Sequence, residues 1–312
     1  MTRRNPSCIR SPLRDTKFCI EPYVYTMTIF FAASIIMLLV TPSLNPNNPA
    51  YASMNNTLTI ASSDASDSSK RVLIVGTSHS VLGDTGYPTG VWLPEMTHPY
   101  YALKNSGAEI DITTPQGGNI PVDPYSIPSY IYSTNRDDPM TEKFLRTPDD
   151  VSKINNTLQL SEINSSDYST VVFPGGNGAT YDFPWNEDVN RIASEIYERG
   201  GIVAAVCHGP AALLNATSSN GIPLVNGMNV TGFSNEEEAI TEILIGAKNV
   251  VPLFLEDEFP KRGAMFVKDY VHEPNVVISG EGGRLITGQN PESAFNVGMK
   301  VVEMLPGLDT GR

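Results

Sequence analysis

A cysteine directly followed by a histidine, Cys207-His208, is the pair of residues best suited to nucleophilic chemistry in this 312-residue chain. A thiolate is a strong nucleophile, and an imidazole beside it can accept and return a proton. The surrounding sequence predicts a strand, a sharp turn at Cys207 and a helix, with the small residues Ala205 and Gly209 two positions on either side. This pattern is typical of a nucleophile elbow, in which small neighbours let the strand and helix backbones approach each other. At a helix N-terminus beside an imidazole, the thiol is expected to have a lowered pKa and to be largely ionised near neutral pH.

A second turn, Pro174-Gly-Gly-Asn-Gly178, follows another predicted strand. It precedes Cys207 by about 30 residues, the length of one β-α-β unit, so the two strand ends are expected to lie side by side. The backbone N–H groups of Gly176 and His208 would then form an oxyanion hole that faces developing negative charge.

The elements that must position these residues alternate along the chain from residue 71 onward. Short apolar runs predict strands at residues 72–75, 109–113, 170–173, 202–206, 229–231 and 276–279. Longer amphipathic runs predict helices at residues 93–106, 186–199, 210–214, 235–245 and 291–304. Strands made of continuous Val and Ile indicate a parallel sheet that is covered on both faces. The sequence therefore predicts an α/β fold, a flavodoxin-like parallel sheet sandwiched by helices, with the nucleophile elbow at one strand end.

One domain, residues 71–312, is expected to carry the site, with an insertion at about residues 118–165. The insertion is rich in Pro, Asp, Asn and Ser, and one helix is expected in it near residues 140–145. It is expected to fold over the carboxyl edge of the sheet. Residues 53–70 predict a linker, because they are rich in Ser, Asn and Asp and lack large apolar groups.

Residues 1–52 have the order of a secretory signal peptide: basic residues, an apolar run at residues 27–40, and a cleavage site after Ala52. Counted from Tyr23, the apolar run has 18 residues, so a membrane anchor through residues 23–40 is the alternative. Both readings predict export, with the domain extracellular or anchored facing outside. Sequons compatible with export occur at Asn55, Asn155, Asn164, Asn215 and Asn229.

Composition excludes several classes of protein and site. The chain has 34 acidic and 21 basic residues and a net charge of -13, which argues against a nucleic-acid partner. Cys8 and Cys19 precede the apolar run, so Cys207 is the only cysteine of the predicted domain and a disulfide framework is excluded there. The sequence shows no tight group of His, Cys and Asp, so neither a metal nor a cofactor is expected.

Six motifs that include these residues occur in order along the chain. They are Trp92-Leu-Pro-Glu-Met-Thr-His-Pro-Tyr100, Pro174-Gly-Gly, Tyr181-Asp-Phe-Pro184, Ala204-Ala-Val-Cys-His-Gly-Pro-Ala211, Thr231-Gly-Phe-Ser-Asn-Glu-Glu-Glu238 and Leu285-Ile-Thr-Gly-Gln-Asn-Pro291. Together they resemble the ThiJ/PfpI superfamily, which has a class I glutamine-amidotransferase-like fold, over about residues 70–306. Within it, the sequence is most similar to the branch of glutathione-independent glyoxalase III enzymes and heat-shock chaperones.

The resemblance implies roles for individual residues. Cys207 matches the nucleophile, His208 the histidine that follows it, and Glu95 the carboxyl group that lies against the sulfur. To exchange a proton near neutral pH, Glu95 needs a raised pKa, which burial beside the sulfur would provide.

The third member of the triad in this branch is an acidic residue a few positions after a Thr-Gly-Phe motif. Spacing places it at Glu238, where it would orient His208, although Glu236 and Glu237 are close enough to leave the choice open.

The expected substrate pocket includes Asn177, Tyr181 and Trp92. The branch often has histidine where this chain has Asn177, so the resemblance does not fix substrate preference. His79, in the loop after the first strand, is expected to be a solvated loop residue.

The resemblance implies a cofactor-free lyase of the D-lactate dehydratase type that converts methylglyoxal, a small dicarbonyl, and water to lactate. It also implies a homodimer. The alternatives are a stress-related holdase chaperone whose thiol senses oxidation, a protein deglycase, and a PfpI-like cysteine peptidase.

Overall fold

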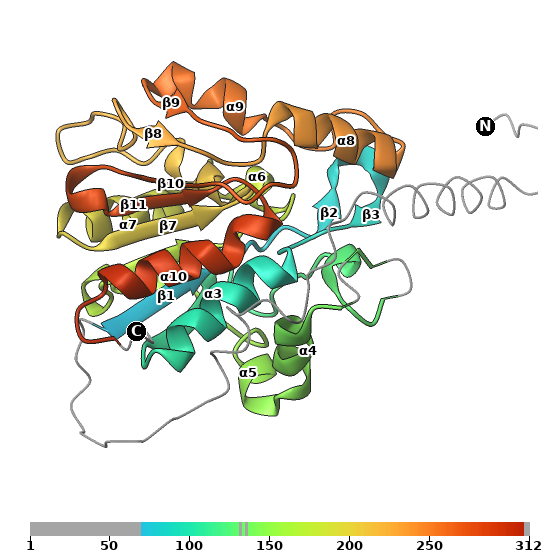
Figure 1. Ribbon diagram of the computed structural model, residues 1–312, viewed down its shortest axis with the longest axis horizontal. Helices are drawn as coiled ribbons and strands as arrows, with labels where there is room; N and C mark the ends of the chain where they lie inside the picture. The colour runs from blue at the N-terminus through green and yellow to red at the C-terminus, as the bar shows by residue number, and fades with distance from the viewer. Residues whose placement is uncertain (1–69, 131–132, 135–136, 309–312) are drawn as a thin grey trace, which may run out of the picture. The chain divides into compact units, whose positions relative to one another are not determined.

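A seven-stranded sheet forms the centre of the computed structural model, which describes residues 70–308 except 131–132 and 135–136 (Figure 1). The strand order is β10-β11-β7-β6-β1-β4-β5, and all neighbours are parallel except β10 and β11. The strands of this sheet are β1 Arg71–Val75, β4 Glu109–Thr114, β5 Leu158–Gln159, β6 Thr170–Phe173, β7 Ile202–Val206, β10 Val276–Ser279 and β11 Leu285–Gly288. Two small sheets pair β2 Val81–Leu82 with β3 Tyr87–Pro88, and β8 Asn229–Val230 with β9 Met265–Phe266.

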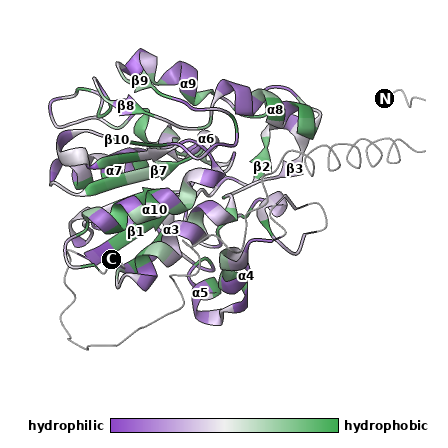
Figure 2. Ribbon diagram, in the orientation of Figure 1, coloured by the Kyte–Doolittle hydropathy of each residue, from purple (hydrophilic) through white to green (hydrophobic). Residues whose placement is uncertain are grey.

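Helices cover both faces of the sheet, as the continuous apolar strands predicted. The four longest helices are α3 Leu93–Asn105, α7 Glu187–Glu198, α8 Asn235–Ile245 and α10 Ala294–Met304. The shorter ones are α4 Pro139–Arg146, α5 Pro148–Ser152, α6 Ala179–Asp182 and α9 Leu255–Glu258. In Figure 1, α3 and α10 lie side by side on one face, and α7 packs against β6 and β7. Figure 2 shows hydrophobic colouring on the central strand β7, whose residues are all buried. The expected flavodoxin-like α/β fold is confirmed.

A glycine in α10 allows this helix to pack closely against α3. A Cβ built on Gly298 of α10 would lie 2.7 Å from the Cα of Pro99 in α3, which is closer than a side chain can pack. The absence of a side chain at Gly298 therefore lets α10 press against the helix that carries Glu95.

The predicted elements differ from the structure in several details. The strand β11 was not predicted, because Leu285-Ile-Thr-Gly288 is short and ends in a glycine. The predicted helix at residues 210–214 is a short 3-10 helix, Gly209–Leu213. The predicted strand at residues 229–231 pairs with β9 outside the main sheet, and helical structure at residues 291–304 begins with a 3-10 turn before α10.

The predicted insertion contains the expected helix, α4, and adds the edge strand β5 to the main sheet. Two buried carboxylates attach it to α3. Asp138 caps α4 and bonds the His98 imidazole at 2.9 Å, while Asp150 accepts hydrogen bonds of 2.7 Å from both Tyr100 and Tyr101. Because α3 also carries Glu95, the insertion helps to fix the helix from which that carboxyl group projects.

The predicted signal peptide or anchor at residues 1–52, and the predicted linker apart from Lys70, lie outside the described residues. Within the described part of the chain, no helix combines the length and apolar character needed to cross a membrane.

The turn after β7 packs closely against the end of β6, at the carboxyl edge of the sheet. Cys207 has a φ of 57°, in the left-handed region that L residues rarely adopt. A Cβ on Gly209 would lie 1.9 Å from the carbonyl oxygen of Phe173, and one on Gly175 would lie 2.5 Å from the nitrogen of His208. Glycine at positions 175 and 209 is therefore what allows the elbow to rest directly on the end of β6.

We expect Gly209→Ala to destabilise the fold by about 2–3 kcal/mol, because the new methyl group must displace the backbone of Phe173. Gly76→Ala is the matched control: its Cβ would meet only the side chain of Ile120, at 3.1 Å from the terminal methyl group, and no backbone, so we expect a cost within ~1 kcal/mol. Urea denaturation of both variants measures the difference. Equal free energies of unfolding would show that the close approach at Gly209 is absent.

Candidate active site

Cys207 lies at the carboxyl end of β7, next to the turn that follows β6. Its side chain is only 3% exposed, and the backbone N–H of Cys207 donates to the carbonyl of Gly288 at the end of β11. The strand, strained turn and short helix form the elbow that the sequence predicted. This elbow holds the sulfur where the ends of three neighbouring strands meet.

His208 lies between the thiol and a carboxylate. Its Nδ1 is 3.4 Å from the Cys207 sulfur, and its Nε2 is 2.8 Å from Oε1 of Glu238 in the first turn of α8. The imidazole also packs on the ring of Phe233, with 4.6 Å between ring centroids. The three side chains Cys207, His208 and Glu238 thus form a continuous hydrogen-bonded series with little access to solvent.

The three consecutive glutamates differ in their surroundings. Glu238 is 1% exposed and bonds His208, whereas Glu236 is exposed and pairs with Lys268 at 3.4 Å. Glu237 is buried but accepts its hydrogen bonds from Ser234 and other neutral donors. Of the three, only Glu238 bonds the imidazole in this structure.

Glu95 projects from the first turn of α3 toward the thiol and is fully buried. Its Oε2 accepts a 2.8 Å hydrogen bond from the backbone N–H of Gly175, while its buried Oε1 has no N–H or O–H donor. Burial raises the pKa of Glu95 well above its usual value, and its interactions with Cys207 and Gly175 oppose that rise only in part. An ionised oxygen without a donor would be costly here, so the neutral carboxylic acid is favoured.

The expected low pKa of Cys207 was wrong. Burial raises the pKa of the thiol well above its usual value, and Glu95 raises it further through a hydrogen bond and, when it is ionised, through its negative charge. The helix expected to offset this is a 3-10 helix of five residues, so few peptide dipoles are aligned on the sulfur. The thiol is therefore favoured at rest, and the thiolate must form as its proton leaves.

The glycine turn after β6 connects the parts of the site. The N–H of Gly176 bonds the Cys207 sulfur and lowers its pKa in part, and Gly175 lies against the backbone nitrogen of His208. The carbonyl of Gly175 accepts from the N–H of Trp92, which precedes α3. The two backbone N–H groups expected to form the oxyanion hole, those of Gly176 and His208, thus lie beside the sulfur. The role of Gly175 as donor to Glu95 was missed, although the Gly-Gly pair was the signal for it.

The predicted pocket residues Asn177, Tyr181 and Trp92 are all half-buried. The Tyr181 hydroxyl donates to the carbonyl of Val250, and its ring stacks on His79 with 4.1 Å between centroids. The expectation that His79 is a solvated loop residue was wrong, because this stacking half-buries it against Tyr181.

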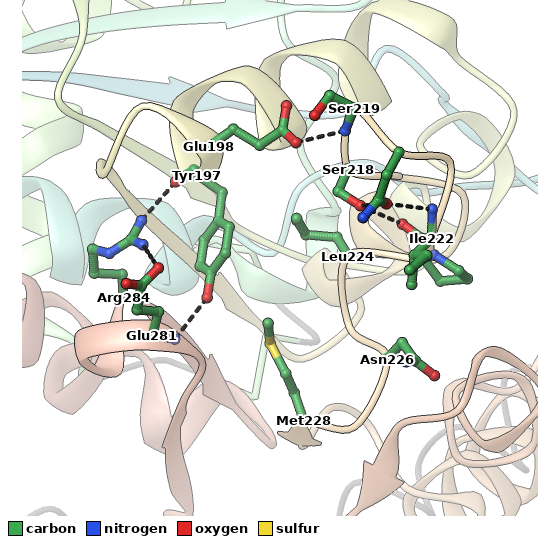
Figure 3. A pocket seen from close by; sticks show the side chains of 12 residues that line it. Tyr197, Glu198, Ser218, Ser219, Ile222, Leu224, Asn226, Met228, Glu281 and Arg284 are labelled. Atoms are coloured by element: carbon green, nitrogen blue, oxygen red, sulfur yellow. Dashed lines mark hydrogen bonds and ion pairs between the residues drawn. The ribbon is translucent and has the colours of Figure 1, made fainter.

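A surface cavity of about 490 Å³ lies at the other end of the sheet (Figure 3). Its lining includes Tyr197, Glu281 and Arg284, and Arg284 is already bonded to the carbonyl of Tyr197 and to Glu281. Lining residues lie near the amino ends of β7 and β11, and none of them belongs to the site around Cys207. Across residues 70–308 as described, no three His, Cys, Asp or Glu side chains are grouped to hold a metal ion.

Comparison with known proteins identifies relatives over most of the chain. The glutathione-independent glyoxalase HSP31 of Saccharomyces cerevisiae is 32% identical over 240 residues, covering 76% of this chain and 98% of the relative. Glyoxalase 3 of Candida albicans is 29% identical and covers 74% of this chain and 97% of the relative.

Solved structures agree with this. The crystal structure of glyoxalase III from Candida albicans superposes with a TM-score of 0.66 at 28% identity, over 76% of this chain and 98% of that one. The Francisella tularensis protein REP24 superposes with a TM-score of 0.68 at 36% identity, over 76% and 99%. Residues 87–304 also match the DJ-1/PfpI family. The order of motifs, the fold and these matches together establish that the chain belongs to the DJ-1/PfpI family.

Proposed function

We propose that the chain is a glutathione-independent glyoxalase of the glyoxalase III type, which converts methylglyoxal and water to lactate. The observation that carries the proposal is a buried thiol placed between an imidazole backed by a carboxylate and a buried carboxyl group of raised pKa. The glyoxalase names of the relatives support it.

The first step is attack of sulfur on the aldehyde carbon. As the C–S bond forms, the thiol proton passes from Cys207 to Nδ1 of His208, and Glu238 stabilises the resulting imidazolium through Nε2. The aldehyde oxygen takes a proton from the neutral carboxyl group of Glu95, with the N–H groups of Gly176 and His208 facing the developing charge. The product is a hemithioacetal on Cys207.

The second step moves a proton between carbons. Glu95, now ionised, removes the proton from the former aldehyde carbon to give an enediolate, and then delivers it to the neighbouring carbon. As the carbonyl of the former aldehyde carbon re-forms, its hydroxyl proton passes to the oxygen on the neighbouring carbon, so the hemithioacetal becomes a lactoyl thioester of the same composition. Water then attacks the thioester as Glu95 takes one of its protons, and the sulfur leaves with the proton held by His208. Lactic acid is released and ionises to lactate, and Cys207, His208 and Glu95 return to their starting protonation states.

Burial of the sulfur favours a small dicarbonyl over a peptide as the substrate. Cys207 is 3% exposed and His208 is 2% exposed, so an extended peptide has little access to either. This favours the glyoxalase-type lyase, in the D-lactate dehydratase class, over a cysteine peptidase.

Replacing Cys207 with alanine is expected to abolish lactate formation from methylglyoxal, because no covalent intermediate can form. NMR detection of lactate measures the loss. Cys8→Ala is the matched control and is expected to keep full turnover, since Cys8 precedes the domain. Asn177→His, at the half-buried pocket position, is expected to keep or increase turnover. Lactate production by the Cys207 variant would contradict the mechanism.

Glu95→Gln is expected to make the Cys207 thiol ionise more readily and yet to slow the turnover of methylglyoxal. When Glu95 is ionised, its negative charge raises the pKa of Cys207. Glutamine cannot acquire that charge as the pH rises, so in the variant the thiol should ionise at a lower pH. Turnover should still fall about 100-fold or more, because an amide cannot carry the proton between carbons.

Thiolate absorbance as a function of pH measures the first effect, with the Cys207→Ala protein subtracted as a baseline, and lactate formation measures the second. A variant with an unchanged thiol pKa, or with undiminished turnover, would show that Glu95 lacks the proposed role.

A further inference from the structure

Glu237, the neighbour of Glu238, is a buried carboxylate to which the mechanism assigns no role. Its side chain is 2% exposed, and no lysine or arginine forms an ion pair with it within the described ranges. Burying a carboxylate without such a cation is costly unless several hydrogen bonds compensate for the lost water.

The compensating donors are neutral and come from three separate segments of the chain. Oε2 accepts from the N–H of Ser234 at 2.9 Å and from its hydroxyl at 2.8 Å, which closes the capping box of α8. Oε1 accepts from Asn290 at 3.0 Å and from the N–H of His272 at 3.4 Å, and the amide of Gln289 lies 3.3 Å from both oxygens. Glu237 therefore ties the start of α8 to the turn that follows β11.

That same turn contacts the nucleophile elbow. The carbonyl of Gly288 accepts the N–H of Cys207 at 2.9 Å, and Gly288 directly precedes Gln289 and Asn290. Hydrogen bonds therefore connect Cys207 to Glu237 through the turn after β11. The next residue, Glu238, is connected back to Cys207 through His208.

Successive residues on an α-helix point about 100° apart, so fixing one side chain fixes the direction of the next. We propose that Glu237 is a positioning residue: its hydrogen bonds to Gln289 and Asn290 set the rotation of the first turn of α8, so that the Glu238 carboxylate meets His208. The effect on turnover rests on the proposed function, whereas the effect on the His208 hydrogen bond does not.

A double-mutant cycle in the full-length chain tests this inference, with Glu237→Gln, Glu238→Gln and both together. In the glutamine variant the NH₂ group must face either the donors of Ser234 or the amide donors of Gln289 and Asn290, so part of the hydrogen-bonded set is lost with little change in size. We expect Glu237→Gln to lower kcat for methylglyoxal at least about tenfold, with KM changed much less. In the Glu238→Gln background the same substitution should have no further effect, within about twofold.

The matched control is Glu236→Gln, on the exposed neighbour, which should leave kcat within about twofold of the original value. Histidine side-chain NMR supplies a readout that does not depend on turnover. The downfield N–H resonance of the His208 to Glu238 hydrogen bond should disappear in Glu237→Gln as in Glu238→Gln, and persist in Glu236→Gln. Asn290→Ala, which removes one donor to Glu237, serves as the second variant if Glu237→Gln does not fold.

Additive losses of kcat in the double-mutant cycle would overturn the inference. A Glu237→Gln protein with a lowered Tm and an unchanged kcat would do the same. So would a His208 resonance that survives in Glu237→Gln. If the unmodified chain does not convert methylglyoxal, the proposed function fails, and the resonance alone then decides whether Glu237 positions Glu238.

Discussion

The site depends on burying a carboxyl group and a thiol side by side. Among the residues that the structure describes, no lysine or arginine forms an ion pair with Glu95, and burial raises the pKa of both Glu95 and Cys207 above their usual values. Each therefore favours its neutral form, and a charge can develop on one only as a proton moves. The remaining features of the site follow from this constraint. His208 and Glu238 receive the thiol proton, and the turn after β6 supplies N–H groups where charge develops.

Close packing between the elbow and the turn after β6 brings the thiol and the carboxyl group together. Gly175 and Gly209 remove side chains where the elbow touches β6, and Cys207 adopts a left-handed conformation at the point of contact. The turn after β6 also contacts the start of α3, because the N–H of Trp92 donates to the carbonyl of Gly175. This contact brings Glu95 to the sulfur. One short glycine segment thus aligns the nucleophile, the carboxyl group and the backbone donors.

Much of this arrangement was predictable because it follows from local sequence. The elbow rests on small residues around Cys207, and the parallel sheet on continuous apolar strands. The spacing after Thr-Gly-Phe placed Glu238, but only tertiary packing shows that its two neighbours point elsewhere. The thiol pKa was mispredicted because local sequence suggested a helix dipole, whereas burial and Glu95, from a helix more than one hundred residues earlier, dominate. The stacking of His79 on Tyr181 was missed for the same reason, since no local pattern encodes a contact between distant loops.

The most direct test of the account is the protonation state of Glu95 in the resting protein, measured by infrared difference spectroscopy of the original chain against Glu95→Gln. Burial raises the pKa of Asp123 and of Asp182 to about 6 each, so at about pH 8 both are mainly ionised and do not obscure the signal. We expect the difference spectrum to show loss of a carboxylic acid C=O band that shifts in D₂O. Loss of a carboxylate band instead would mean that Glu95 is ionised beside the sulfur, and would contradict the account.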